Sequence, residues 1–303
     1  MEQDIIKSFQ PPFSIGKLLV LAIDLGGTKI QYALFGKDNS IELNETAPTE
    51  KRIVIQLKTI IRRLQTEYPG QIQMISIGVP GPTKNNVMQS SMPLNYFEDL
   101  NFAKTFSDFD IPLIVKNDLN MAAYCELKQG VGKEYKNFCL VSLSTGIGVT
   151  AINNGIILEG RIEMGHQVFS PDIKPEQACT NHVNCWVSLA SGSGIEKRFG
   201  SSENPSSESI FENVFDESAL EDLKAINAQA FGNIINAYDP DIIVIMGSLG
   251  LKQFDKIIPD SKTIERFTIN RPIPGIIKCQ AEENIGILGA NYAARIEMES
   301  LND

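Results

Sequence analysis

The sequence predicts an α/β protein built from two similar halves that face each other. An apolar strand, a glycine turn and a second strand open the first half at residues 17–35, and the same arrangement opens the second half at residues 137–155. Strand-like and helical patterns then alternate through each half. Two facing α/β lobes are therefore the simplest architecture.

In the first half, the apolar strand at residues 17–25 brings Asp24 to the start of a glycine turn. The turn leads into a second strand-like run at 28–35. The remaining elements of this half are a helix, two strands and a further helix, expected at about 53–67, 73–82, 111–118 and 118–130.

The second half opens with strands on either side of a turn at 144–148. The elements that follow are two helices, a strand and a terminal helix, expected at about 186–199, 217–237, 241–248 and 285–299. Since no low-complexity tract or long linker separates the halves, we expect short hinges near 118–130 and near 286.

Charge and composition limit the function classes. The 303 residues include 27 Lys and Arg against 37 Asp and Glu, a net charge of −10, so no basic stripe can hold a nucleic-acid backbone. No apolar run approaches the roughly 20 residues that span a bilayer, and no signal-peptide pattern opens the chain. These features favour a cytoplasmic protein that acts on small molecules, with no nucleic-acid or membrane partner. Five cysteines argue against a disulfide framework and direct attention to metal binding.

The first glycine turn is a candidate phosphate cradle, with the residues Asp24, Leu25, Gly26, Gly27, Thr28 and Lys29. Glycines let backbone N–H groups approach a bulky anion. Alone, two glycines after a strand are equally typical of a plain hairpin. Residues 144–148, with Thr145 and Gly146 at the tip, form a matching turn in the second half. Two such turns can hold one triphosphate from opposite sides.

Two other nucleotide-binding motifs are excluded. The run Gly130 to Lys133 looks like a phosphate-binding lysine loop, but Leu127 stands where the earlier glycine is required. Glu134 also replaces the Ser or Thr that would hold magnesium. No G-x-G-x-x-G follows the first strand, so a dinucleotide site lacks its central feature.

Asn117 and Asp118 lie where an apolar strand ends and a helix starts, which is where ligands of open α/β sheets commonly bind. One interpretation is a simple helix cap. In the functional interpretation, Asp118 accepts the proton of an attacking sugar hydroxyl and Asn117 hydrogen-bonds a neighbouring hydroxyl. That arrangement suits phosphoryl transfer, which depends more on positioning and charge neutralisation than on a strong base.

The only two histidines of the sequence fall near cysteines at metal-ligand spacing. The four residues of this set are His166, Cys179, His182 and Cys185. Two thiolates and two imidazoles complete a tetrahedral site, which is the pattern of structural zinc. A lone member of the set would be an ordinary packed residue, whereas the four together predict a bound zinc ion.

With these pieces in place, the sequence resembles the ROK family of sugar kinases within the actin and hexokinase-like superfamily, from about residue 18 to 295. The segments that carry the resemblance are DLGGTK at 24–29, GVPGP at 78–82, ND at 117–118, STGIG at 144–148, EMGH at 163–166, ASG at 190–192, IVIMGSLG at 243–250 and IGILGA at 285–290. The resemblance implies a two-lobed, actin-like ATPase (ribonuclease H-like) fold, in which each lobe is a mixed sheet flanked by helices.

The resemblance also implies an activity, ATP-dependent phosphorylation of a hexose or amino sugar, with Mg²⁺ and structural Zn²⁺ as metals. The lobes would be residues 1–118 with 286–303, and residues 119–285. ATP would lie between them, the sugar deeper in the cleft, and closure would follow binding. The chain is expected to form a homodimer.

Carried over by motif, Asp118 is the general base, Asn117 and Glu163 contact the sugar, and His166 touches both sugar and zinc. The residues expected to hold the nucleotide and its phosphates are Asp24, Gly26, Gly27, Thr28, Lys29, Thr145, Gly146 and Gly247.

The sequence departs from the family pattern at two places. The zinc motif is C-x2-H-x2-C, a variant that resembles fructokinase-type members, and Val187 stands where the family usually has a sugar-binding Glu. The second departure keeps an alternative open, a non-catalytic sugar-binding or sugar-sensing protein. Family repressors carry a DNA-binding domain before the kinase-like fold, and only about 16 residues precede the first strand here, so DNA-binding repression is not expected.

Overall fold

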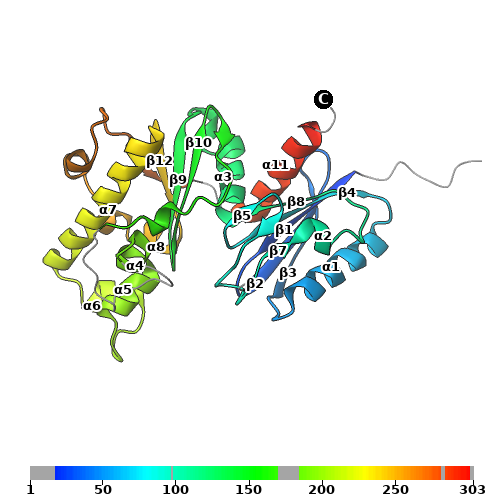
Figure 1. The fold of residues 1–303 in the computed structure, drawn as a ribbon, viewed down its shortest axis with the longest axis horizontal. Coiled ribbons are helices and arrows are strands. Elements are labelled where there is room, and N and C mark those ends of the chain that lie inside the picture. The colour runs from blue at the N-terminus through cyan, green and yellow to red at the C-terminus, as the bar shows by residue number, and fades with distance from the viewer. Residues whose placement is uncertain (1–17, 97, 170–183, 281–283, 301–303) are drawn as a thin grey trace, which may run out of the picture.

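The computed structural model describes residues 18–96, 98–169, 184–280 and 284–300, which form two mixed five-stranded sheets and their helices (Figure 1). The first sheet has the order β3-β2-β1-β4-β8 and the second has the order β11-β10-β9-β12-β13. In each sheet an antiparallel meander is followed by two parallel strands. The repeat that the sequence predicts is therefore confirmed at the level of sheet topology.

The strands of the first sheet are β1 (Leu19–Leu25), β2 (Lys29–Phe35), β3 (Ile41–Pro48), β4 (Ile72–Val79) and β8 (Leu113–Asn117). Those of the second are β9 (Phe138–Leu143), β10 (Ile147–Asn153), β11 (Ile156–Ile157), β12 (Ile242–Met246) and β13 (Gly275–Lys278). A small third sheet comprises β5 (Thr83–Lys84), β6 (Val87–Met88) and β7 (Leu100–Asn101).

The longer helices are α1 (Ile53–Glu67), α3 (Asp118–Gln129), α5 (Gly192–Phe199), α7 (Glu217–Tyr238) and α11 (Ile285–Ser300). The shorter ones are α2 (Phe102–Thr105), α4 (Trp186–Ala190), α6 (Ser207–Asn213), α8 (Ser248–Lys252), α9 (Phe254–Ile257) and α10 (Ser261–Ile264). The 3₁₀ turns among the described residues are η1 (Val131–Lys133), η2 (Met164–His166) and η4 (Glu265–Phe267). Within the described ranges, no helix combines the length and apolar character that a bilayer span requires.

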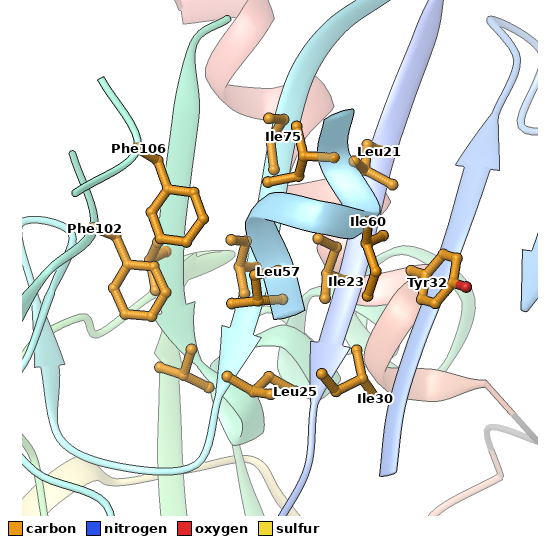
Figure 2. Close-up of a cluster of buried hydrophobic side chains, with 14 of the residues drawn as sticks. Leu21, Ile23, Leu25, Ile30, Tyr32, Leu57, Ile60, Ile75, Phe102 and Phe106 are labelled. Carbon is orange, nitrogen blue, oxygen red and sulfur yellow. The ribbon is translucent and has the colours of Figure 1, made fainter. Parts of the chain in front are cut away.

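The layers follow from strand alternation, because successive side chains point to opposite faces. Leu21, Ile23 and Leu25 of β1 face α1, where they meet Leu57 and Ile60 (Figure 2). The intervening Val20 and Ala22 face α3 and α11 instead. These two helices lie between the sheets in Figure 1, and one buried cluster joins them to strands of both sheets. A further cluster packs α4, α5 and α7 on the outer face of the second sheet.

Helix α11 packs against α3, β1 and β4. The last described helix therefore returns to the first sheet. The division into lobes at 118/119 and 285/286 stays a prediction.

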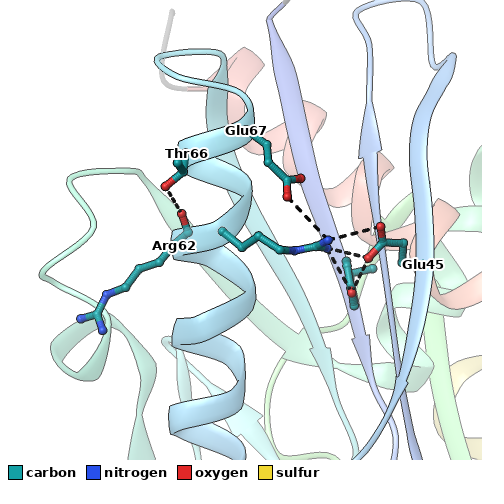
Figure 3. Close-up of polar contacts among 6 residues, drawn as sticks. Glu45, Arg62, Thr66 and Glu67 are labelled. Atoms are coloured by element: carbon teal, nitrogen blue, oxygen red, sulfur yellow. Dashed lines mark hydrogen bonds and ion pairs between the residues drawn. The ribbon is translucent and has the colours of Figure 1, made fainter.

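The strand β3 was not predicted from the sequence. It is an edge strand, IELNETAP, in which the apolar alternation of Ile41, Leu43 and Ala47 is interrupted by Glu45. Leu43 and Ala47 pack partly buried against the core. A polar cluster adds to this: Arg63 of α1 pairs with Glu45 at 2.5 Å between Nη2 and Oε2 (Figure 3). The hydroxyl of Tyr32 on β2 donates to the same Glu45 carboxylate over 2.6 Å.

The single helix predicted at 186–199 is wrong, because the structure contains two helices there, α4 and α5. They are separated at Ser191, whose backbone is extended. The Ser191 hydroxyl accepts a hydrogen bond from the Gly194 N–H over 3.1 Å and so caps α5. A serine whose side chain competes for backbone N–H groups favours a helix start over a helix interior.

Candidate active site

A cavity of about 450 Å³ opens between the two halves, and six of the predicted site residues line it. Those from the first half and its boundary are Asp24, Asn117 and Asp118, and those from the second half are Thr145, Gly146 and Glu163. Segments that are distant in sequence therefore meet at one cavity. Among the described residues, the other predicted site residues, which are Gly26, Gly27, Thr28, Lys29, His166, Cys185 and Gly247, are not part of its lining.

Asp118 is the first residue of α3 and is open to the cavity. The helix cap is Asn117, whose side-chain oxygen accepts from the Leu119 N–H over 2.9 Å. Its amide nitrogen donates to the Gly81 carbonyl over 3.1 Å. Asn117 is therefore the N-cap of α3. The Leu119 N–H also lies 2.8 Å from Oδ1 of Asp118, so Asp118 accepts one local hydrogen bond while it lines the cavity.

The carboxyl group of Asp118 has a pKa of about 7, well above its ordinary value. The main cause is that the cleft walls remove water from around a charged group, although the side chain still faces the cavity. The negative charges of Asp24 and Glu163 raise the pKa further. A carboxyl that titrates near neutral pH is suited to accept a proton from a hydroxyl.

Asp24 is the one partly exposed residue of the otherwise buried strand β1. It is paired with Gly78 of β4 and lies against Gly286 at the start of α11. Burial raises its pKa, and the charge of Lys29 partly opposes this shift. A Cβ added to Gly286 would lie 2.5 Å from Oδ2 of Asp24, so a larger residue there would displace the Asp24 carboxylate. Gly286 lies in one of the segments that carry the family resemblance, but no role for it could be predicted, because Asp24 and Gly286 are far apart in the sequence.

The two glycine turns differ in their surroundings. In the first, the Gly26 N–H donates to the Lys29 carbonyl over 2.9 Å, and Thr28 and Lys29 are exposed. A Cβ on Gly27 would lie 2.6 Å from the Pro93 carbonyl oxygen. The first turn thus packs tightly against the loop that contains Pro93 and presents exposed residues at its tip.

The second turn is open and lies against α5 and α8. Nothing lies within 4 Å of a Cβ placed on Gly146. The Ser144 hydroxyl is 3.2 Å from the Ser248 hydroxyl at the start of α8. Ser144 and Thr145 line the large cavity and also a smaller one of about 180 Å³ that extends toward α6 and α8. The two cavities therefore share this turn as a common wall.

Gly247 lies just before α8, next to the second turn. Its φ of 86° is in the left-handed region, and a Cβ there would lie 2.4 Å from the Leu143 carbonyl oxygen. Both constraints require glycine at this position. Gly247, which is predicted to lie near the adenosine, directly precedes Ser248, and Ser248 lines the smaller cavity.

The segment after β11 brings Glu163 to the cavity and then forms η2. Burial raises the pKa of Glu163. A Cβ on Gly165 would lie 1.9 Å from the Ile147 carbonyl oxygen and 3.3 Å from Cγ2 of Val187. Val187, the residue that replaces the expected Glu, therefore packs directly against the E-x-G-H turn.

Two of the four predicted zinc ligands are described. Nδ1 of His166 lies 3.8 Å from Sγ of Cys185. Tetrahedral zinc with bonds of about 2.3 Å to sulfur and about 2.0 Å to nitrogen separates two such ligands by about 3.5 Å. The pair therefore fits one zinc ion. Cys179 and His182 lie outside the described residues, and within those residues no group of three or more Cys, His, Asp or Glu is arranged to hold a metal.

Comparison with known proteins agrees with this arrangement. The chain is 26% identical to the N-acetylmannosamine kinase of Haemophilus influenzae over 90% of its own length and 94% of that protein. It is 28% identical to the xylose repressor of Bacillus spizizenii over 75% of its length, which spans 60% of the repressor. Fructokinase of Pediococcus pentosaceus is 27% identical over 77% of this chain and 81% of its own.

Solved structures share the fold. The ROK hexokinase of Thermus thermophilus superposes with a TM-score of 0.75 at 23% identity, covering 93% of this chain and all of that one. A ROK glucokinase of Streptomyces griseus, solved with glucose and AMPPNP, gives 0.70 at 20% identity, covering 92% and 99%. The expected two-lobed, actin-like α/β fold with mixed sheets flanked by helices is confirmed. The model of the ROK family matches residues 20–296, so the chain belongs to the ROK family.

Proposed function

We propose that the chain is an ATP-dependent sugar kinase that phosphorylates a hydroxyl of a hexose or an N-acylated amino sugar. The observation that supports this most is the single cavity where Asp118, with a pKa near 7, faces the open Thr145–Gly146 turn. A base and a phosphate cradle on opposite walls are what in-line transfer to a hydroxyl requires. The similarity to an N-acetylmannosamine kinase and to a fructokinase supports a sugar as the phosphoryl acceptor.

In this mechanism Asn117 and Glu163 bind the sugar so that one hydroxyl points at Asp118. Asp118 accepts the hydroxyl proton as the oxygen attacks the terminal phosphoryl group of ATP. The open turn at Thr145 and Gly146 holds the phosphate chain through its backbone N–H groups. The exposed tip of the first turn at 28–29 is the proposed second contact to the phosphates, and the smaller cavity beside Ser144 receives the nucleoside near Gly247.

Magnesium would neutralise negative charge on the phosphates. Asp24 fits that role, since it is a carboxylate at the rim of the same cavity. A cytoplasmic location, a homodimer and the absence of nucleic-acid partners stay predictions.

A coupled assay of ADP release tests the proposal. The purified protein is given MgATP with glucose, fructose, mannose, N-acetylglucosamine and N-acetylmannosamine in turn. Turnover with at least one sugar supports the kinase. A protein that binds one of these sugars by calorimetry but releases no ADP above the background supports the second candidate, a non-catalytic sugar sensor. That candidate draws on the repressor relative and on Val187.

Structural zinc is part of the proposal, and its removal gives a prediction. We expect about one zinc per chain, held by His166, Cys179, His182 and Cys185, and we expect chelation to lower the melting temperature and the sugar affinity together. The two effects are coupled because His166 serves both the metal and the sugar. Elemental analysis, thermal melts and sugar titrations before and after chelation measure this. Metal-free protein with unchanged sugar binding would contradict it.

The apolar side of the cavity predicts an unusual acceptor. Leu158 and Ile162 line the cavity and remain 37% and 38% exposed. Val187, which packs against Gly165 of the E-x-G-H turn, stands where the family pattern has a carboxylate. A buried sugar hydroxyl left without its partner costs roughly 1–3 kcal/mol. We therefore expect weak glucose binding, and a preference for a sugar whose corresponding group is apolar, absent or bound elsewhere.

The variant Val187→Glu is expected to bind glucose about tenfold more tightly, because the new carboxylate can accept from the unpaired hydroxyl. Titration calorimetry measures this, and Val214→Glu is the control, since Val214 is an exposed residue at the end of α6. Equal or weaker glucose binding by Val187→Glu would show that the local backbone differs from the family pattern.

A further inference from the structure

A three-residue cluster joins the two halves directly beside the catalytic pair. The ammonium group of Lys116, the residue before Asn117 on β8, pairs with Oε1 of Glu159. The Tyr124 hydroxyl on α3 donates to the same oxygen over 2.8 Å. The Lys116 ammonium also lies 5.7 Å from the centroid of the Tyr124 ring, within cation–π distance. One carboxylate oxygen of Glu159 is thus contacted by two donors, Lys116 from β8 and Tyr124 from α3.

Glu159 belongs to the segment 158–163, which links β11 to η2. Leu158, Gly160, Ile162 and Glu163 of this segment line the large cavity, whereas Lys116 and Tyr124 do not. Lys116 and Tyr124 therefore contact the segment at Glu159, whereas neighbouring residues of the segment line the cavity. Lys116 and Tyr124 act on the cavity only through Glu159.

The pair differs from the other ion pairs of the described residues. Those join elements within one half, such as Lys58 to Asp108, and all involve cations with 25% or more of the side chain exposed. The Lys116 side chain is 14% exposed, and its pair alone, among those of the described ranges, crosses between the halves. Burial of its stem and ring stacking limit the conformations that Lys116 can adopt, so this contact has a defined geometry.

We propose that Lys116, Tyr124 and Glu159 form an interlobe latch that positions the segment 158–163 against the catalytic end of α3. The latch rests on the proposed function, because its purpose is to set Glu163 and the apolar wall relative to Asp118. These three are positioning residues and do not touch the reacting atoms. By holding the segment in place before the sugar arrives, the latch reduces the ordering cost of binding.

The latch predicts a selective effect on the sugar. Among the described residues, no hydrogen bond or ion pair joins the turn at Thr145 or the segment at Gly247 to these three side chains. We therefore expect nucleotide binding to be insensitive to them. Glu159 is half exposed, and an exposed pair contributes little to global stability. Loss of the latch therefore changes sugar binding without a matching change in ATP binding or melting temperature.

The test uses Glu159→Gln, which keeps the shape and removes the charge, and Lys116→Met. With N-acetylmannosamine and MgATP, each variant is expected to raise the sugar KM about tenfold, with the ATP KM within twofold of wild type. The double variant should show about the same loss as either single one, because both remove one contact. Lys116→Arg, which can still donate to Glu159, should restore most of the sugar affinity.

A second measurement does not depend on kinase activity. Hydrogen exchange of the backbone at residues 158–166, in protein without substrate, is expected to be faster in Glu159→Gln than in wild type. The matched control is Asp108→Asn, which removes the charge that pairs with Lys58 and Arg62 away from the cavity and should leave exchange at 158–166 unchanged.

Unchanged exchange at 158–166 in both latch variants would overturn the proposal, as would a rise of the ATP KM equal to that of the sugar KM. If wild type shows no turnover with any sugar, the proposed function fails. Faster exchange in Glu159→Gln would still establish the latch in that case.

Discussion

Replacing Asp118 by Asn is expected to lower the turnover number about 100-fold or more, while sugar affinity stays close to that of wild type. Asn keeps the shape of the side chain but cannot accept the hydroxyl proton. Helix α3 should still form, since its cap is the neighbouring Asn117. Steady-state kinetics gives the turnover number, and calorimetry with the same sugar gives the affinity.

The control for this variant is Asp110→Asn. Asp110 is an exposed residue with a φ of 41°, a backbone conformation that Asn adopts readily. Its substitution makes the same chemical change in a loop before β8 and should not affect turnover. Near-normal turnover in Asp118→Asn would mean that Asp118 is not the base.

The pH profile tests the same group. The pKa of Asp118 is raised to about 7, so its basic form predominates above that pH and is lost as the pH falls. The kcat/KM of wild type should therefore drop as the pH is lowered through about 7, and Asp118→Asn should lack this step. Asp24 and Glu163, which also face the cavity with raised pKa values, would shift the midpoint through their charges.

The sequence predicted those parts of the molecule whose information is local. The strand, glycine turn and strand at β1 and β2 could be recognised from consecutive residues, and so could the helix that starts at Asp118. Their recurrence in the second half predicted two matching sheets, which the topology confirms. Asp24, Asn117 and Asp118 could be named as site residues because each lies at or next to the carboxyl end of a predicted strand, where ligands of α/β sheets commonly bind.

What the sequence could not predict depends on contacts between distant segments. The strand β3 was missed because Glu45 interrupts the alternation of Ile41, Leu43 and Ala47, and the residue that pairs with Glu45, Arg63, lies on a separate element. The close contact of Gly286 with Asp24 and the pairing of Lys116 with Glu159 join residues that single-sequence patterns cannot relate. Each becomes visible only when the two halves are brought together.

Packing between α3 and α11 is expected to make Gly289→Ala strongly destabilising. A Cβ on Gly289 would lie 1.7 Å from the carbonyl oxygen of Met121 and 2.4 Å from its carbonyl carbon. Both atoms belong to a helix backbone, so no side-chain rotation can relieve the clash. We expect the free energy of unfolding to fall by about 1–3 kcal/mol or more, as overpacked interiors do.

The same substitution should reduce turnover in the protein that remains folded. Met121 is one helical turn from Asp118, so a displacement of α3 moves the proposed base relative to the second glycine turn. Gly275→Ala is the matched control, because nothing lies within 4 Å of a Cβ at that position. Thermal and denaturant unfolding give the stabilities, and kinetics below the melting transition gives turnover. If Gly289→Ala melted at the wild-type temperature, α3 and α11 would have to pack less closely than the structure indicates. In that case α11 could not be the element that fixes α3 and Asp118 between the two sheets.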